Sequence, residues 1–246
     1  MEKKARCGPM DKKKRNRIRC REKRGMKIKT FFCIVLWLMI VDMGPALSDE
    51  PDFIFVGEFS QHGMAEWSKK AFVDETIYTP AMIGGNKALE AVSQSSASGL
   101  IKKIRIDIDA YPFLNWRWRI ENRLSGTFDE KQKQGDDYAA RIYVVVSGGL
   151  AVWNTRALNY VWAQNSKKGE TWPNAFAKDN AVMMALRSSE DPLSIWHMEK
   201  RNVREDFLQL FGKEVRYIDA VVLMSDTDNT GNKVTAYYGD IYFSRY

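Results

Sequence analysis

The sequence predicts a mainly all-β protein, an antiparallel β-sandwich with one short helix, from three observations. Short segments with period-two alternation recur along the chain after residue 48, separated by turn-forming residues. One segment, 202–211, has the apolar spacing of an amphipathic helix. The strand-like segments do not alternate with helices, which argues against parallel β/α units.

The first 48 residues predict an export leader. Phe31–Val41 is an unbroken apolar run, preceded by Lys27 and Lys29 and followed by the small residues Ala46 and Ser48. A basic region, an apolar core of roughly 7–15 residues and small residues before the cleavage point describe a signal peptide. We expect cleavage after Ser48. An uncleaved anchor is the alternative, although a spanning helix needs about 20 apolar residues.

The basic character of the chain belongs to this leader. Met1–Gly25 carries twelve Lys/Arg and three acids. A nucleic-acid arm conflicts with an export signal, so we interpret the stretch as a long basic region or as the result of a true start at Met26. Without residues 1–48 the chain has 24 basic and 27 acidic residues, a formal charge of −3. We therefore expect no nucleic-acid partner and an exported product, periplasmic or secreted, with no membrane span after cleavage.

Cysteine chemistry is excluded from the rest of the chain. Cys7, Cys20 and Cys33 all lie in the leader, so residues 49–246 have no disulfide, thiolate metal site or cysteine nucleophile. Those residues suit a single β-sandwich domain, because a chain of this size buries enough surface to fold without covalent staples.

The first part of the domain contains the clearest alternation. Ile104, Ile106 and Ile108 alternate with charged residues, so one face of this strand should point to the core and the other to solvent. A short helix or a covering loop is expected around Trp67. The β-prone segments expected here are 52–59, 75–79, 89–93 and 101–109.

The central segments 115–120 and 135–146 also predict strands. Trp116 and Trp118 share one face of the first segment, and Arg117 and Arg119 share the other. The loop between the two segments is rich in Ser, Gly, Lys and Gln, so the sequence predicts an antiparallel hairpin with a long polar tip.

The last part of the domain contains the predicted helix, 202–211, which should end at Gly212. Residues 217–225 are almost continuously apolar, which indicates a strand buried on both faces. Residues 227–233 have turn composition. The other strands expected here are 157–163, 181–187, 194–200, 234–238 and 240–243.

Several longer phrases are more specific than these patterns: Asn115–Arg119, Gly135–Tyr143, Ala157–Trp162, and Met224–Gly231 with Tyr237–Ile241. In this order they closely resemble an exported bacterial family, the domain-of-unknown-function family numbered 3047. The resemblance covers roughly residues 53–243. It implies a jelly-roll-like sandwich similar to carbohydrate-binding modules, and it implies no established activity.

A set of charged and amide residues has two interpretations. Arginine forks match carboxylates, so the set either forms an ion-pair network that joins strands or lines a groove for a polar ligand. Its members are Arg117, Arg119, Asp136, Asp137, Arg141, Asp226, Asp228, Asn229 and Asp240.

The tryptophans after the leader include two groups, one expected in the core and one that could stack on a ligand. Trp116, Trp118 and Trp162 lie in predicted strands and should be core residues. Trp153 and Trp172 lie in predicted loops and are candidates for an exposed stacking platform. The candidate ligand-binding residues are Arg117, Arg119, Asp136, Asp137, Arg141, Trp153 and Trp172.

Metal binding is a weaker hypothesis. The acidic turn does not fit an EF-hand, because Thr230 and Tyr237 stand at the fifth and twelfth positions. An Asx-stabilised turn is one interpretation. The alternative is a structural calcium, which sandwich modules of the kind that this chain resembles often hold; its candidate ligands are Asp226, Asp228, Asn229 and Asp240. We expect no other cofactor.

The sequence does not identify a reaction. His62 and His197 cannot form a three-histidine zinc site, and no serine stands in a G-x-S-x-G elbow. We predict a non-catalytic binding module for a glycan or another polar envelope ligand. The alternatives are a hydrolase that uses Asp136 or Asp137 with Asp226 or Asp228, and a structural or interaction protein in which the Arg/Asp network only stabilises the sheets.

Overall fold

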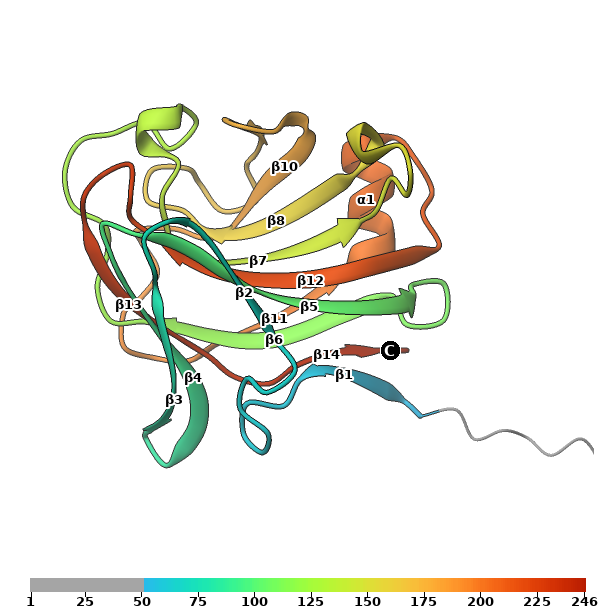
Figure 1. The fold of residues 1–246 in the computed structure, drawn as a ribbon, viewed down its shortest axis with the longest axis horizontal. Coiled ribbons are helices and arrows are strands. Elements are labelled where there is room, and N and C mark those ends of the chain that lie inside the picture. Colours follow the sequence, from blue (N-terminus) through green and yellow to red (C-terminus); the bar gives the residue numbers. More distant parts are fainter. Residues whose placement is uncertain (1–50) are drawn as a thin grey trace, which may run out of the picture. The chain divides into compact units, whose positions relative to one another are not determined.

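The computed structural model describes residues 51–246, which form two stacked β-sheets and one short helix (Figure 1). The predicted all-β, jelly-roll-like sandwich is therefore confirmed. The leader predicted for residues 1–48 lies outside the described residues.

Sheet A has seven strands. Strand β6 lies near its centre, with β11 on one side and both β13 and β14 on the other. The strands are β1 (Phe53–Gly57), β14 (Ile241–Ser244), β6 (Phe113–Ile120), β13 (Lys233–Tyr238), β4 (Asn86–Gln94), β3 (Ile77–Ile83) and β11 (His197–Asn202).

Sheet B also has seven strands, and β7 is the central one. Its pairs are antiparallel except for β8 and β10, which run parallel with Ala157 opposite Ala181. In spatial order the strands are β2 (Ser68–Val73), β5 (Ala97–Asp107), β12 (Tyr217–Asp226), β7 (Tyr138–Val146), β8 (Arg156–Trp162), β10 (Lys178–Arg187) and β9 (Thr171–Asn174).

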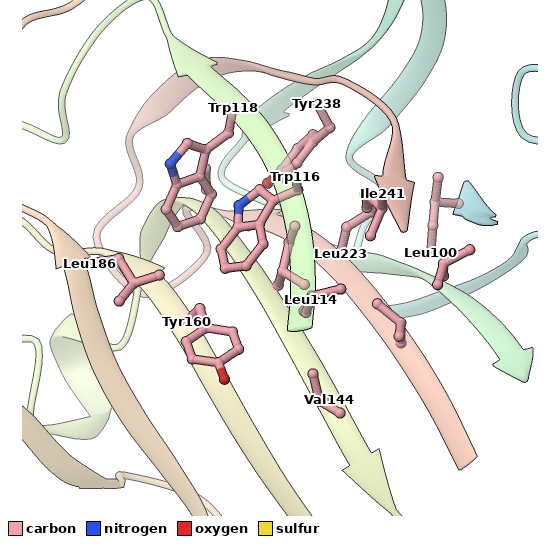
Figure 2. Close-up of a cluster of buried hydrophobic side chains, with 14 of the residues drawn as sticks. Leu100, Leu114, Trp116, Trp118, Val144, Tyr160, Leu186, Leu223, Tyr238 and Ile241 are labelled. Carbon is pink, nitrogen blue, oxygen red and sulfur yellow. The ribbon is translucent and has the colours of Figure 1, made fainter. Parts of the chain in front are cut away.

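The core between the sheets is built on aromatic side chains (Figure 2). Trp116 and Trp118 of β6 meet Tyr160 and Trp162 of β8, with ring centroids 5.4 Å apart for Trp116–Tyr160 and 5.9 Å for Trp118–Trp162. All four are buried, so the predicted core role of the three tryptophans is confirmed. Since Trp116 and Trp118 point inward, the alternate residues of β6 point out of sheet A.

The predicted central hairpin is wrong. Strand β6 pairs with β11, β13 and β14 of sheet A, whereas β7 pairs with β12 and β8 of sheet B. The polar segment between β6 and β7, which includes the 3₁₀ turn η1 (Lys133–Gly135), crosses from one sheet to the other. The apolar faces of β6 and β7 pack toward each other across the core between the sheets, so the two strands face each other instead of pairing edge to edge.

Helix α1 (Val203–Phe211) confirms the predicted helix and its end. The side chain of Asn202 accepts a hydrogen bond from the backbone N–H of Glu205, which caps the first turn. Gly212 follows with φ of 63°, a left-handed conformation that glycine adopts without strain. Val203 and Phe207 are buried in the core. Nine residues are far fewer than a bilayer crossing requires, and residues 51–246 contain no other α-helix.

Two segments differ from the local prediction. The region after Trp67 forms strand β2, whose six residues are all exposed, so it has little apolar periodicity to reveal it. Strand β9 contains Trp172, a residue that was predicted to lie in a loop. These two strands are the outer edges of sheet B.

Candidate functional site

Alternation along the central strands gives sheet B a polar outer face, the face turned away from sheet A. Arg141 and Tyr143 of β7 point outward because the alternate residues Ile142 and Val144 point into the core. The register places Met224 of β12 opposite Arg141 and Asn159 of β8 opposite Tyr143. These four side chains help to line a cavity of about 470 Å³, which we call the sheet B cavity. A volume of this size is typical of small-ligand sites.

The walls of the sheet B cavity come from opposite edges of the sheet. Phe72 and Val73 belong to edge strand β2, and Asn174 and Phe176 belong to edge strand β9 and the turn that follows it. Strands with five others between them in the sheet can line one cavity only if the sheet curls, so its outer face is concave there. Phe72 is 64% exposed and Phe176 is 56% exposed, which leaves both rings available to a ligand.

Arg141 is the only basic residue among those that line the sheet B cavity. Its Nη2 lies 2.8 Å from Oδ2 of Asp226 and donates to the Sδ of Met224 at 2.9 Å. The guanidinium also lies over the rings of Tyr138 and Tyr143, 5.5 and 5.1 Å from their centroids. Its Nε is buried without a hydrogen-bond partner. The protein therefore fixes this cation in place without using all of its donors.

Three carboxylates lie at one end of the sheet B cavity, on Asp136, Asp226 and Asp228. Asp226 is paired with Arg141, and both oxygens of Asp136 accept from Nδ2 of Asn174, at 3.1 and 3.3 Å. Burial is the main reason why the pKa of each of these three carboxyls is raised, that of Asp226 most of all. Arg141 opposes this rise, and neighbouring carboxylates, including that of Asp137, add to it.

Asp137 lies beside this group and holds the acidic turn. Its Oδ1 accepts from the backbone N–H and the Nδ2 of Asn229, at 3.2 and 3.1 Å. Its Oδ2 accepts from the backbone N–H and the hydroxyl of Thr230, both at 2.6 Å. Carboxylate oxygens of Asp137, Asp226 and Asp228 lie within 4.8 Å of one another, close enough to share one cation. However, four hydrogen bonds already occupy both carboxylate oxygens of Asp137.

The remaining predicted residues lie elsewhere. Arg117 stacks on Trp196 with a centroid distance of 4.7 Å, and Arg119 pairs with Glu121; both are on the outer face of sheet A. Asp240 accepts from the backbone N–H and the hydroxyl of Ser60, at 2.8 and 2.6 Å. The expectation of one cluster is therefore wrong for Arg117, Arg119 and Asp240, because a sandwich has two outer faces and the sequence does not show which of them a polar residue joins.

The two tryptophans predicted to form an exposed stacking platform lie in different places, and only one of them is exposed. Trp153 lies in the 3₁₀ turn η2 (Val152–Asn154) and is 68% exposed, but it does not line the sheet B cavity. Trp172 is only 6% exposed, so its predicted exposure is wrong. It lies on β9 and packs on a small apolar cluster that includes Tyr138 and Met183 on the outer side of sheet B.

The sequence interpretation missed several residues of the sheet B cavity. Tyr143 shares the outward face of Arg141, two residues along the same strand, so alternation could have identified it. Asn159 is a single amide within an apolar strand, a second usable signal. Phe72 and Phe176 reach the cavity only because the sheet curls, and no local pattern predicts that.

The fold and this cavity define a β-sandwich protein with a concave, ligand-sized site on one outer face. The chain belongs to the family described as protein of unknown function (DUF3047), whose model matches residues 65–242. This confirms the resemblance seen in the sequence. No curated protein matches the chain.

The solved structures that resemble this chain have low sequence identity to it and low structural similarity. The family 11 carbohydrate-binding module from Clostridium thermocellum, in complex with a β-1,3-1,4-mixed-linked tetrasaccharide, is 9% identical with a TM-score of 0.41, covering 78% of this chain and 95% of that one. A cellulase derived from Cel12A of Rhodothermus marinus is 7% identical with a TM-score of 0.41, covering 71% and 100%. A lectin from Bauhinia forficata in complex with GalNAc is 9% identical with a TM-score of 0.36, covering 79% and 99%. Similarity this distant transfers neither a ligand nor an activity.

Proposed function

We propose that this protein is an exported, non-catalytic binding module that holds a glycan in the sheet B cavity. Its export is inferred from the leader-like sequence of residues 1–48. The observation that carries the binding role is one concave site that combines a fixed polar floor with two exposed aromatic rings on facing walls.

The lining of the cavity suits a ligand with both polar and apolar surfaces. Arg141 and Asn159 can donate to ligand oxygens, and the carboxylates of Asp136 and Asp228 can accept from hydroxyl groups. Phe72 and Phe176 offer apolar faces on which the C–H side of a sugar ring can pack. A saccharide presents hydroxyl groups around its edge and an apolar face, so it matches both features.

The test is a screen of oligosaccharides against the purified protein, followed by calorimetric titration of the ones that bind. Phe72→Ala and Phe176→Ala should each weaken binding, because aromatic anchors at binding sites are worth more than about 1 kcal/mol, at least roughly 5-fold in Kd. Met82→Ala is the matched control, since Met82 is 62% exposed but lies on β3 of sheet A. If the two phenylalanine variants and the control bind equally well, the ligand does not occupy this cavity.

A hydrolase is the second candidate, because the raised pKa of Asp136 and of Asp228 suits an acid catalyst beside a bound sugar. The same titrations separate the two functions when the oligosaccharide is analysed afterwards for cleavage products. Intact ligand supports the binding module. Cleavage that Asp136→Asn or Asp228→Asn abolishes, with an unchanged circular dichroism spectrum, assigns an enzyme instead.

A further inference from the structure

The charges that line the sheet B cavity do not balance. Its single cation, Arg141, is paired with Asp226. Within residues 51–246, no Lys, Arg or His nitrogen lies within 4.0 Å of a carboxylate oxygen of Asp136 or Asp228. When ionised, these two side chains give the cavity two negative charges that no protein cation pairs with directly.

Burial makes this imbalance costly. Asp136 is only 4% exposed, and both of its carboxylate oxygens accept from the neutral amide of Asn174. A buried carboxylate that no cation pairs with directly is unfavourable, and Arg141 offsets this only in part, because burial still raises the pKa of Asp136. A cationic group of a ligand would therefore be stabilised here, whereas a uronate or a phosphate would be repelled.

The shape of the cavity indicates an organic cation rather than a bare metal ion. About 470 Å³ is far more space than one ion fills, and much of the wall is apolar, including Phe72 and Phe176. Arg141 lines the same cavity, so its guanidinium favours acceptor oxygens on the same ligand. An amino sugar supplies an amine, hydroxyl oxygens and an apolar ring face together.

On the basis of the proposed function, we propose that the sheet B cavity selects a glycan with a free amino group, whose ammonium lies against Asp136 and Asp228. The amine donates to the two carboxylates, the ring packs between the aromatic walls, and the sugar oxygens accept from Arg141. N-acetylation of the amine removes its charge and should weaken binding.

The experiment is calorimetric titration of the full protein with three probes at about pH 7, because burial raises the pKa of Asp136 and Asp228 and the higher pH favours their ionised forms while amines remain largely protonated. The probes are a glucosamine oligosaccharide, its N-acetylated counterpart of equal length, and spermidine. We expect the glucosamine oligosaccharide to bind at least about ten-fold more tightly than the N-acetylated one, and its affinity to fall as salt is added. Spermidine, which has no ring, should bind more weakly than the amino sugar.

Two variants locate the effect. Asp136→Asn and Asp228→Asn should reduce the ten-fold preference to about two-fold or less. Glu190→Gln, an exposed acid outside the cavity, should preserve it. Asp228 is partly exposed, so its variant should fold even if Asp136→Asn does not.

The outcomes separate this inference from the proposed function. Equal or tighter binding of the N-acetylated sugar overturns the amine preference and leaves glycan binding in place. Spermidine binding as tightly as the amino sugar, or no sugar binding at all, overturns both. Calcium ions that bind at the carboxylates and leave the two sugars equal in affinity also overturn the amine preference.

Discussion

Asp226→Asn is the sharpest test of the polar floor of sheet B. The substitution keeps the shape of the side chain and an oxygen that can still accept from the backbone N–H of Tyr138, but it removes the charge that faces Arg141. The side chains of Arg141 and Asp226 are only 9% and 2% exposed, so water cannot screen the loss. We expect unfolding to become easier by about 3–5 kcal/mol, the range for a buried pair that loses one partner.

The exposed pair Arg204–Asp109 supplies the control. Its side chains are 41% and 50% exposed, so Asp109→Asn should change stability by less than about 1 kcal/mol. Urea unfolding followed by circular dichroism measures both variants, and similar m-values would show that the unfolded states are comparable. In a domain of this size, the larger loss corresponds to a fall in Tm of at least roughly 6 °C.

A result in which the two variants lose the same small amount of stability would refute the reasoning. It would mean that water or Asp136 compensates Arg141, since Asp136 also lies close enough to raise the pKa of the guanidinium. The double variant Asp136→Asn/Asp226→Asn distinguishes these cases, because only compensation by Asp136 makes the two losses more than additive.

Three further predictions concern the same region. Burial raises the pKa of Asp136 in the folded state above its value in the unfolded chain, so the folded state binds the proton more tightly, and this residue's contribution to stability falls as the pH rises between the two pKa values. The urea midpoint of Asp136→Asn should therefore depend less steeply on pH in that range than the midpoint of the unsubstituted protein. An unchanged slope of midpoint against pH would contradict the assignment. A chelator should leave the Tm unchanged, because hydrogen bonds already occupy both oxygens of Asp137; a clear drop would show that a cation is part of the fold. Trp153→Phe should remove most of the acrylamide-quenchable fluorescence and Trp172→Phe very little of it, given exposures of 68% and 6%; the opposite order would disprove the placement of β9.

Local patterns in the sequence were sufficient for most of the elements. The helix was predictable because its apolar spacing, its Asn202 cap and its Gly212 stop all act within a few residues of one another. The inward faces of β5 and β6 were predictable because alternation is a property of a single strand. Both predictions depend on short-range physics.

Strand pairing was not predictable in the same way. Alternation shows which face of β6 is buried, but it does not show which strands lie beside β6 in its sheet. Two of its true neighbours, β13 and β14, begin more than 100 residues further along the chain. A long polar connection is compatible both with a hairpin loop and with a crossover between sheets. The sequence analysis predicted the hairpin, whereas the structure has the crossover.

The candidate site was predictable to the same partial extent. Arg141 and the acidic residues near 136 and 226 were identified by residue type, and the pairing of β7 with β12 brings them together. Arg117 fits the same residue-type criterion but points out of the other sheet. Trp172 appeared exposed because its sequence neighbours are polar, whereas the residues it packs on come from other strands, including β7 and β10.

The two edges of sheet B that line its cavity have a mechanical consequence. Strands β2 and β9 are the outermost strands of the sheet, and each has a hydrogen-bonded neighbour on one side only. A molecule that contacts Phe72 and Phe176 at once would connect the two edge strands across the cavity. Ligand binding should then slow hydrogen exchange of the backbone amides of β2. Local opening of this edge strand would become less frequent as more of the protein is bound to ligand.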